Sequence, residues 1–158
     1  MKLKYISWIP AFIIMCLIFN FSSKTAAESD GSSLRIANVL LDLYEDMNGK
    51  PLDMDQKEAI LAQINHVIRK LAHGFEYMVL SLCVAFHLGV CSTEWRRLLL
   101  LSVLVSGFYA ATDELHQLYV TGRSGRLSDV LIDTAGAAVG AALYLLAVKC
   151  IRKSSHTN

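Results

Sequence analysis

The sequence is short of charge. Only 18% of its 158 residues are Asp, Glu, Lys or Arg, and the net charge is +1. No run of Lys and Arg is long enough to serve as a polyanion-binding patch, so we expect no nucleic-acid partner. Hydrophobic residues make up 54% of the chain and the mean hydropathy is +0.41. This balance is more apolar than that of an ordinary soluble domain and predicts a membrane protein.

The sequence also lacks any C-x-x-C pair. Its four cysteines, Cys16, Cys83, Cys91 and Cys150, all fall within or at the ends of apolar segments. This placement predicts free thiols that act as small apolar residues, without a disulfide or a metal-binding role.

Uncharged apolar stretches mark the predicted membrane spans. We place the spans at about residues 5–21, 71–91, 98–116 and 127–148. The uncharged stretches of the last two have 15 residues, about 22 Å of helix, which is short of the ~30 Å hydrocarbon layer, so the flanking polar turn should be drawn into the membrane. Pro10 should bend the first span. The alternative for this segment is a cleaved signal peptide, because Thr25-Ala-Ala27 resembles a small-residue cleavage site. The prediction is an all-α membrane protein, a single domain over residues 1–158 built as a bundle of four transmembrane helices.

Residues 22–70 form a long polar connection, too long to lack helices. Apolar residues recur at helical spacing between Leu34 and Met47, with Arg35, Asn38, Asp42, Glu45 and Asp46 on the other side. This pattern predicts an amphipathic helix on the membrane or on the bundle mouth. Asn48-Gly-Lys-Pro51 should end it, and Asp53 with Gln56 resembles a capping box that opens a second helix.

Basic residues predict the orientation. They lie between the second and third spans, after the fourth, and before the first: Arg96, Arg97, Lys149, Arg152, Lys153, Lys2 and Lys4. Under the positive-inside rule both termini are cytoplasmic and the 22–70 loop lies outside.

Ionisable residues gather where three spans meet the outer face, and such residues beside membrane spans are functional candidates by default. Helical spacing gives each span one polar stripe. Gly136 and Gly140 share a face with Asp133 and should allow close approach of a neighbouring helix. For chemistry we select His73, Glu76, Asp113 and His116; for substrate binding we select Lys70, Tyr77, Gln117, Arg123, Arg126, Asp129 and Asp133.

Several interpretations of this cluster stay open. His73-x-x-Glu76 and Asp113-x-x-His116 suit general acid–base chemistry or a metal ion equally well. The cluster could instead be a structural network in which Asp113 or Asp129 pairs with Lys70 or Arg126. Arg123 and Arg126 lie directly before a helix start, where free N–H groups and the helix dipole favour an anion such as phosphate.

Two motifs resemble the signatures of VanZ-like membrane proteins. Arg69-Lys-Leu-Ala-His-Gly-Phe-Glu-Tyr77 is similar to their R-K-x-A-H-F-x-E-Y pattern. Their second pattern is D-E-x-H-Q, then G-R, then D-x-x-x-D-x-x-G. It is similar to Thr112-Asp-Glu-Leu-His-Gln117 followed by Gly122-Arg-Ser-Gly-Arg126, Asp129 and Asp133-Thr-Ala-Gly136. Asn20-Phe-Ser-Ser-Lys24 resembles a further F-S-S-Q stretch. Gly74 stands where an aromatic residue is common.

The resemblance implies a small multi-pass protein of the bacterial cytoplasmic membrane and a link to resistance to the glycopeptide teicoplanin, but no established chemistry. We weigh two hypotheses. The first is an envelope enzyme or binding protein that recognises a polyprenyl phosphate or a lipid-linked cell-wall precursor. The second is a non-catalytic structural or transport-type protein. Cofactor and metal content are not determined by the sequence.

Overall fold

The computed structural model describes residues 2–49 and 52–155, and within these ranges the chain is helical with no strand. The all-α prediction is therefore confirmed. In chain order the helices are α1 (Lys2–Ile6), α2 (Ile9–Ser22), α3 (Ala26–Asn48), α4 (Met54–Val90), α5 (Trp95–Gln117) and α6 (Leu127–Ser155).

Four helical segments are long and apolar enough to cross a membrane: Leu3–Ser22, α4, α5 and α6. The four predicted spans are thus present, but two are parts of longer helices. α4 already begins at Met54, because the boundary predicted near residue 71 is a change of polarity and not a helix end. The first span is interrupted before Pro10, which lies in the first turn of α2.

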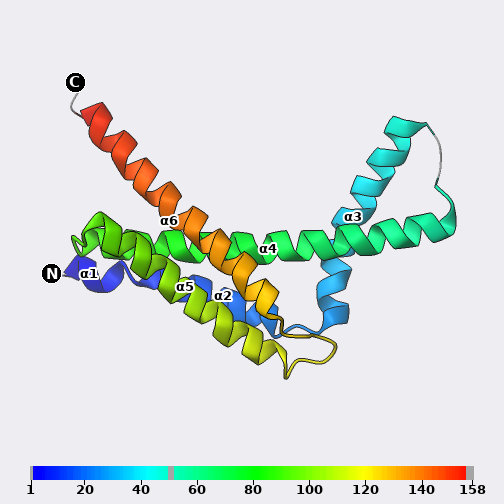
Figure 1. The fold of residues 1–158 in the computed structure, drawn as a ribbon, viewed down its shortest axis with the longest axis horizontal. Coiled ribbons are helices and arrows are strands. Elements are labelled where there is room, and N and C mark those ends of the chain that lie inside the picture. The colour runs from blue at the N-terminus through cyan, green and yellow to red at the C-terminus, as the bar shows by residue number, and fades with distance from the viewer. Residues whose placement is uncertain (1, 50–51, 156–158) are drawn as a thin grey trace.

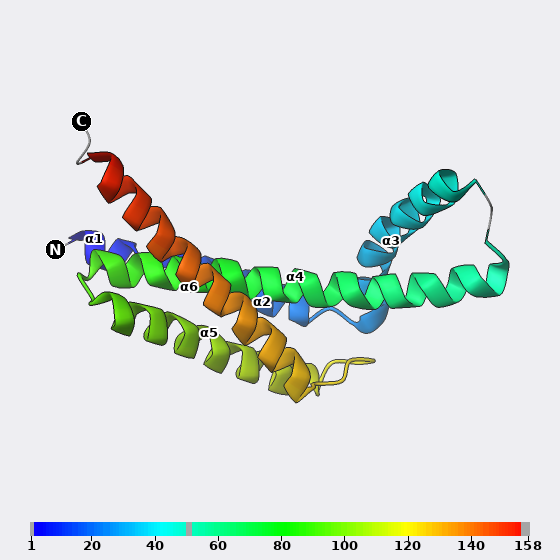
Figure 2. The same cartoon turned by 45° about the horizontal axis from the view of Figure 1, so that its top comes forward.

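Both termini lie at one end of the bundle, together with the turn between α4 and α5 (Figures 1 and 2). We name this the terminal end. The other end holds the link from α2 to α3 and the loop from α5 to α6, and we name it the polar end. The first half of α4 extends beyond the bundle there, and α3 lies beside it (Figure 1). This arrangement agrees with termini on one side of a membrane.

The contact between α4 and α6 depends on two glycines. A Cβ atom on Gly136 would collide with the backbone carbonyl of Gly74, and one on Gly140 would collide with that of Met78. The predicted close approach is therefore present, and its partner is α4. Without side chains between them the two backbones gain van der Waals contact that lipid cannot supply.

α3 starts earlier than the amphipathic pattern suggested. A capping box between Thr25 and Glu28 opens it, and Gly49, with φ of 63°, ends it. The residues considered as a cleavage site therefore form a helix start. Lys50 and Pro51, part of the predicted break, lie outside the described residues. The box expected at Asp53 is a single cap, in which the Met54 N–H donates to the Asp53 carboxylate at 2.8 Å.

The face that α3 turns toward α4 is more polar than predicted. Ser33, Ala37 and Leu41 are buried, and flanking ion pairs join the two helices at Asp30–Arg69 (2.9 Å) and Glu45–Lys57 (2.8 Å). Glu45, assigned to the solvent side, thus contacts α4. Apolar residues such as Val39, Leu43 and Met47 stay exposed, because the helix has more apolar positions than one helical partner can cover.

Candidate functional site

A cavity of about 230 Å³ opens at the polar end between α4, α5, α6 and the loop that joins the last two. We name it the polar cavity. Its lining includes six of the predicted site residues: Lys70, His73, Gln117, Arg123, Arg126 and Asp129. The remaining lining residues are His66, Arg69, Glu114, Gly122, Ser124. The predicted convergence of three spans is therefore present in the fold.

A second hollow of about 260 Å³ adjoins it on the side of α2 and α3. We name it the amphipathic groove, because Phe21, Ile36, Ile68 and Ala72 line it together with Lys24, Ser29, Ser33, Arg69, His73, Glu76, Arg123. Arg69, His73 and Arg123 line both hollows. One molecule could therefore contact these three side chains while extending from a polar into an apolar environment.

His73 and Glu76 form a pair one helical turn apart on α4. The Nδ1 atom of His73 lies 3.4 Å from Oε2 of Glu76, a separation too long for a well-aligned hydrogen bond. Nδ1 faces the carboxylate, which leaves Nε2 as the ring nitrogen able to exchange a proton with a bound molecule.

Lys70 and Asp129 form an ion pair between α4 and α6, and Ser128 also donates to the Asp129 carboxylate, at 3.0 Å. Both side chains are about one quarter exposed. This contact is one of the pairings considered for a structural network, and it takes two predicted substrate-binding residues out of the set that is free to bind a ligand.

Beneath the polar cavity lies a buried polar layer that does not line it. Tyr77, Asp113 and Asp133 are 0%, 4% and 2% exposed. Ser22 donates to Oδ2 of Asp113 at 2.7 Å, and Gln117 donates to the same oxygen at 3.1 Å. The Tyr77 hydroxyl and one oxygen of each Asp have no hydrogen-bond partner among the described residues. The expectation that Asp113 and Asp133 face a cavity is therefore not met.

His116 differs most from its expected place. Its ring stacks on Phe19 with centroids 4.7 Å apart, and its Nε2 lies 3.2 Å from Ser23 Oγ. The residue thus faces α2 and is not among the residues that line either hollow. Asp113 and His116 lie three positions apart on α5, and of these two only Asp113 points inward. Helical spacing alone could not show which neighbouring helix each side chain would meet.

The start of α6 already has an internal anion. Glu114 accepts a hydrogen bond from the backbone N–H of Arg126 at 2.8 Å. The sequence predicts free N–H groups there for a phosphate, and at Arg126 that prediction is wrong. Gly125 allows the contact, because a Cβ atom at this position would collide with the Glu114 carbonyl.

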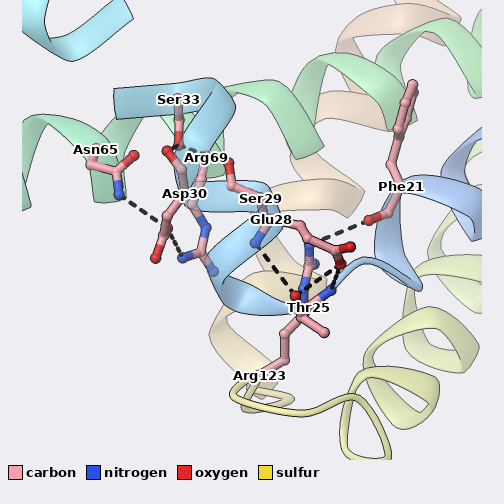
Figure 3. A network of polar contacts seen from close by, with 9 residues as sticks. All are labelled: Phe21, Thr25, Glu28, Ser29, Asp30, Ser33, Asn65, Arg69 and Arg123. Carbon is pink, nitrogen blue, oxygen red and sulfur yellow. Dashed lines mark hydrogen bonds and ion pairs between the residues drawn. The ribbon is translucent and has the colours of Figure 1, made fainter. Parts of the chain in front are cut away.

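Arg123 reaches from the α5–α6 loop to the end of α2, where Nη2 donates to the Phe21 carbonyl at 3.3 Å (Figure 3). Its Nε and Nη1 are buried without a partner among the described residues. Burial lowers the pKa of the guanidinium, and the positive charge of nearby Arg69 lowers it further. A half-buried cation with unused buried donors beside a second cation is an unfavourable arrangement that a bound anion would relieve.

The sequence reasoning missed Arg69, His66 and Ser22. Arg69 stands in the first quoted motif and Ser22 in the F-S-S stretch, so the motif itself was the available signal. For His66, one turn before Arg69 and Lys70, the helical spacing was available. In the part of the chain that the structure describes, no three His, Cys, Asp or Glu residues are grouped to hold a metal ion.

Four membrane-spanning helices with a charged cavity at one end define a multi-pass membrane protein. The chain belongs to the VanZ/LLP1 family, whose sequence model matches residues 7–148. No curated protein and no solved structure matches the chain. The resemblance in the two motifs is thereby confirmed at the level of the family.

Proposed function

We propose that this protein binds an anionic lipid-linked molecule, such as a polyprenyl phosphate or a cell-wall precursor, with its phosphate in the polar cavity. The observation that carries the proposal is Arg123, whose buried Nε and Nη1 have no partner among the described residues. A phosphate offers the acceptor geometry that a guanidinium binds best.

The charges around the cavity support an anion. Lys70 is paired with Asp129, and Arg69 with Asp30. Arg123 has no ion-pair partner among the described residues. Arg126 lines the same cavity, and its backbone but not its side chain engages Glu114. Two guanidinium groups therefore remain for a ligand.

The amphipathic groove supports a lipid. It continues from Arg123 and Arg69 toward Phe21, Ile36 and Ile68, so a chain attached to the phosphate would meet apolar side chains. A soluble phosphate would gain nothing from that surface, whereas each buried methylene of a lipid chain contributes ~0.8 kcal/mol.

Chemistry, if the bound molecule reacts, would fall to His73 and Glu76. His73 lines both hollows and Glu76 orients it, as general acid–base catalysis requires. We assign Asp113 to the support of Gln117 and Ser22, and we leave His116 outside the site. Arg96, Arg97, Lys149 and Arg152 favour an orientation with both termini inside and the cavity outside. The family resemblance implies the bacterial cytoplasmic membrane, where a change in teicoplanin susceptibility would be the cellular readout.

The test compares polyprenyl phosphate with the uncharged polyprenol in nanodiscs, with binding measured by native mass spectrometry. We expect the phosphate to bind more tightly. Arg123→Gln should weaken its binding by about tenfold to a hundredfold, the effect of charge-assisted hydrogen bonds of ~1.5–3 kcal/mol. Arg123→Lys should weaken it less, because charge remains but bidentate geometry is lost.

Arg97→Gln is the matched control, since Arg97 is exposed at the terminal end, away from the cavity. Equal binding of phosphate and alcohol, or equal losses at Arg97 and Arg123, would contradict the proposal.

The second candidate function is structural. The ion pair between Lys70 and Asp129 favours it, because the pair joins α4 to α6 without a ligand. In that case the abundance of the folded protein would fall in proportion to any phenotype across the polar variants. The Asp113→Asn variant separates the two candidates through its effects on stability and on ligand binding.

A further inference from the structure

A histidine and a cysteine lie together at the terminal end, on the opposite side of the bundle from the polar cavity. The Sγ atom of Cys91 is 3.7 Å from Nε2 of His87. On the other side of the ring, Nδ1 lies 2.9 Å from Ser7 Oγ. The Trp8 ring stacks on the imidazole, with centroids 4.6 Å apart.

The hydrogen bonds assign the tautomer of His87. Ser7 has one hydroxyl proton and donates it to the Lys4 carbonyl at 3.1 Å. Its oxygen must therefore accept from Nδ1–H of His87, which leaves the lone pair of Nε2 facing the Cys91 thiol. The chain of contacts runs from thiol to imidazole to hydroxyl to carbonyl, with each proton placed on its donor.

Such a chain prepares a thiol for nucleophilic attack. The imidazole accepts the thiol proton, and Ser7 holds the ring in the tautomer that can do so. Cys91 is half-buried and caps the end of α4, in the turn between two membrane-spanning helices. The thiol thus lies at a membrane surface, within reach of water. Cys16, Cys83 and Cys150 have no comparable histidine contact among the described residues.

An apolar surface cavity of about 430 Å³ begins at the same tryptophan. Tyr5, Trp8, Ile9, Ala11, Phe12 and Met15 line it. Trp8 therefore touches His87 with one face of its ring and belongs to a hollow that would accommodate a hydrocarbon chain along α2. A long-chain electrophile could place its chain there and its reactive carbon at Cys91.

We propose that Cys91 accepts a long-chain acyl group from an acyl thioester, with His87 as the base. The Cys91 sulfur attacks the thioester carbonyl carbon and forms a new C–S bond, and the C–S bond to the leaving thiol breaks. The proton passes from Cys91 to Nε2 of His87 and from there to the leaving thiolate. One thioester replaces another, so the step needs no oxidant or reductant. It is independent of the function proposed for the polar cavity.

The experiment uses the full-length protein in lipid vesicles with alkyne-tagged palmitoyl-CoA, a thioester with a detectable chain. Cys16, Cys83 and Cys150 are changed to Ser so that Cys91 is the one thiol left. We expect acylation at Cys91 that hydroxylamine reverses. Cys91→Ser should abolish it, and His87→Asn, which can still donate to Ser7 but is no base, should slow it about a hundredfold.

Ser7→Ala removes the hydroxyl that orients the ring without removing the base, so it should slow acylation by a smaller factor. Thermal unfolding of each variant shows whether the chain is folded, and the rate is compared among folded variants. Equal acylation rates in His87→Asn, in Ser7→Ala and in the parent protein, in which Cys91 is the one thiol left, would overturn the proposal. Labelling of that parent protein no greater than the labelling of Cys91→Ser would overturn it as well.

Discussion

Helices α4, α5 and α6 pack differently in their membrane half and at the polar end. In the membrane half, α4 and α6 are in backbone contact at Gly140 and Met78, and Leu80, Val84, Ala137 and Ala141 are buried. At the polar end α4, α5 and α6 bury Tyr77, Asp113 and Asp133, each with an oxygen that has no hydrogen-bond partner among the described residues. Among the described residues the membrane half also buries two hydroxyls without a partner, at Ser81 and Ser106. What sets the polar end apart is that it buries carboxyl groups with unpartnered oxygens.

The difference bears on how each half contributes to stability. Buried polar atoms without partners cost free energy, roughly 1–3 kcal/mol each, so the polar end opposes folding while the glycine contact favours it. Ionisable groups retained beside membrane spans are functional candidates by default. The three predictions that follow test this division, beginning with the largest effect on stability.

Gly140→Leu should have the largest effect. The added side chain would collide with the Met78 backbone, which cannot rotate away, so we expect a loss of stability of about 3 kcal/mol or more. Thermal unfolding in detergent and the amount of inserted protein measure it. Gly74→Ala is the matched control on the facing helix, where a Cβ atom would lie an ordinary 3.7 Å from Ile132. If both variants were equally stable, the close contact would not be what joins α4 to α6.

Lys70→Gln should have a moderate effect. It removes the cation that faces Asp129, and both side chains are about one quarter exposed, so we expect a loss of about 1 kcal/mol. Asp129→Asn in addition should restore part of that loss, because no unpaired charge remains. A double-mutant cycle of unfolding free energies gives the coupling. A coupling near zero would remove the structural role of this pair.

Asp113→Asn should change stability least, and it best separates an effect on ligand binding from an effect on stability. The amide oxygen can still accept from Ser22 and Gln117, and a buried ionisable group without an ion-pair partner among the described residues is removed. We expect a change within about 1 kcal/mol, together with altered polyprenyl-phosphate binding, because Gln117 lines the polar cavity.

Unfolding and ligand binding are measured on the same preparation of the Asp113→Asn protein. A loss of stability of about 3–5 kcal/mol would instead place Asp113 in a buried ion-pair network. That outcome would favour the structural function.

Much of the fold could be predicted because membrane helices follow local rules. A span must be apolar over its whole length, and that requirement located all four spans in the sequence. The continuity of α4 from Met54 was missed, because its polarity changes near residue 71 while its helical hydrogen bonds do not. The capping box at Thr25 and Glu28 was not recognised in the sequence, where Thr25-Ala-Ala27 was considered only as the cleavage site of the alternative signal-peptide interpretation.

The site was predicted less completely. Helical spacing placed Lys70 and His73 on one stripe of α4, and both line the polar cavity. On α5 the same reasoning grouped Asp113 with His116, and the structure turns one toward Ser22 and the other toward Phe19 and Ser23. Spacing gives the relative direction of side chains on one helix, but it does not say which neighbour each direction meets.

The sequence by itself determined that the chain is a helical membrane protein and that its ionisable groups gather at one end, because burial of the backbone in lipid permits few solutions. Tertiary structure alone decided which of those groups pair with one another and which remain free for a ligand. Lys70 meets Asp129, Arg69 meets Asp30, and Glu114 caps α6 at Arg126. These pairings depend on the register between helices and on the path of the α5–α6 loop, which position Arg123 between the polar cavity and the amphipathic groove.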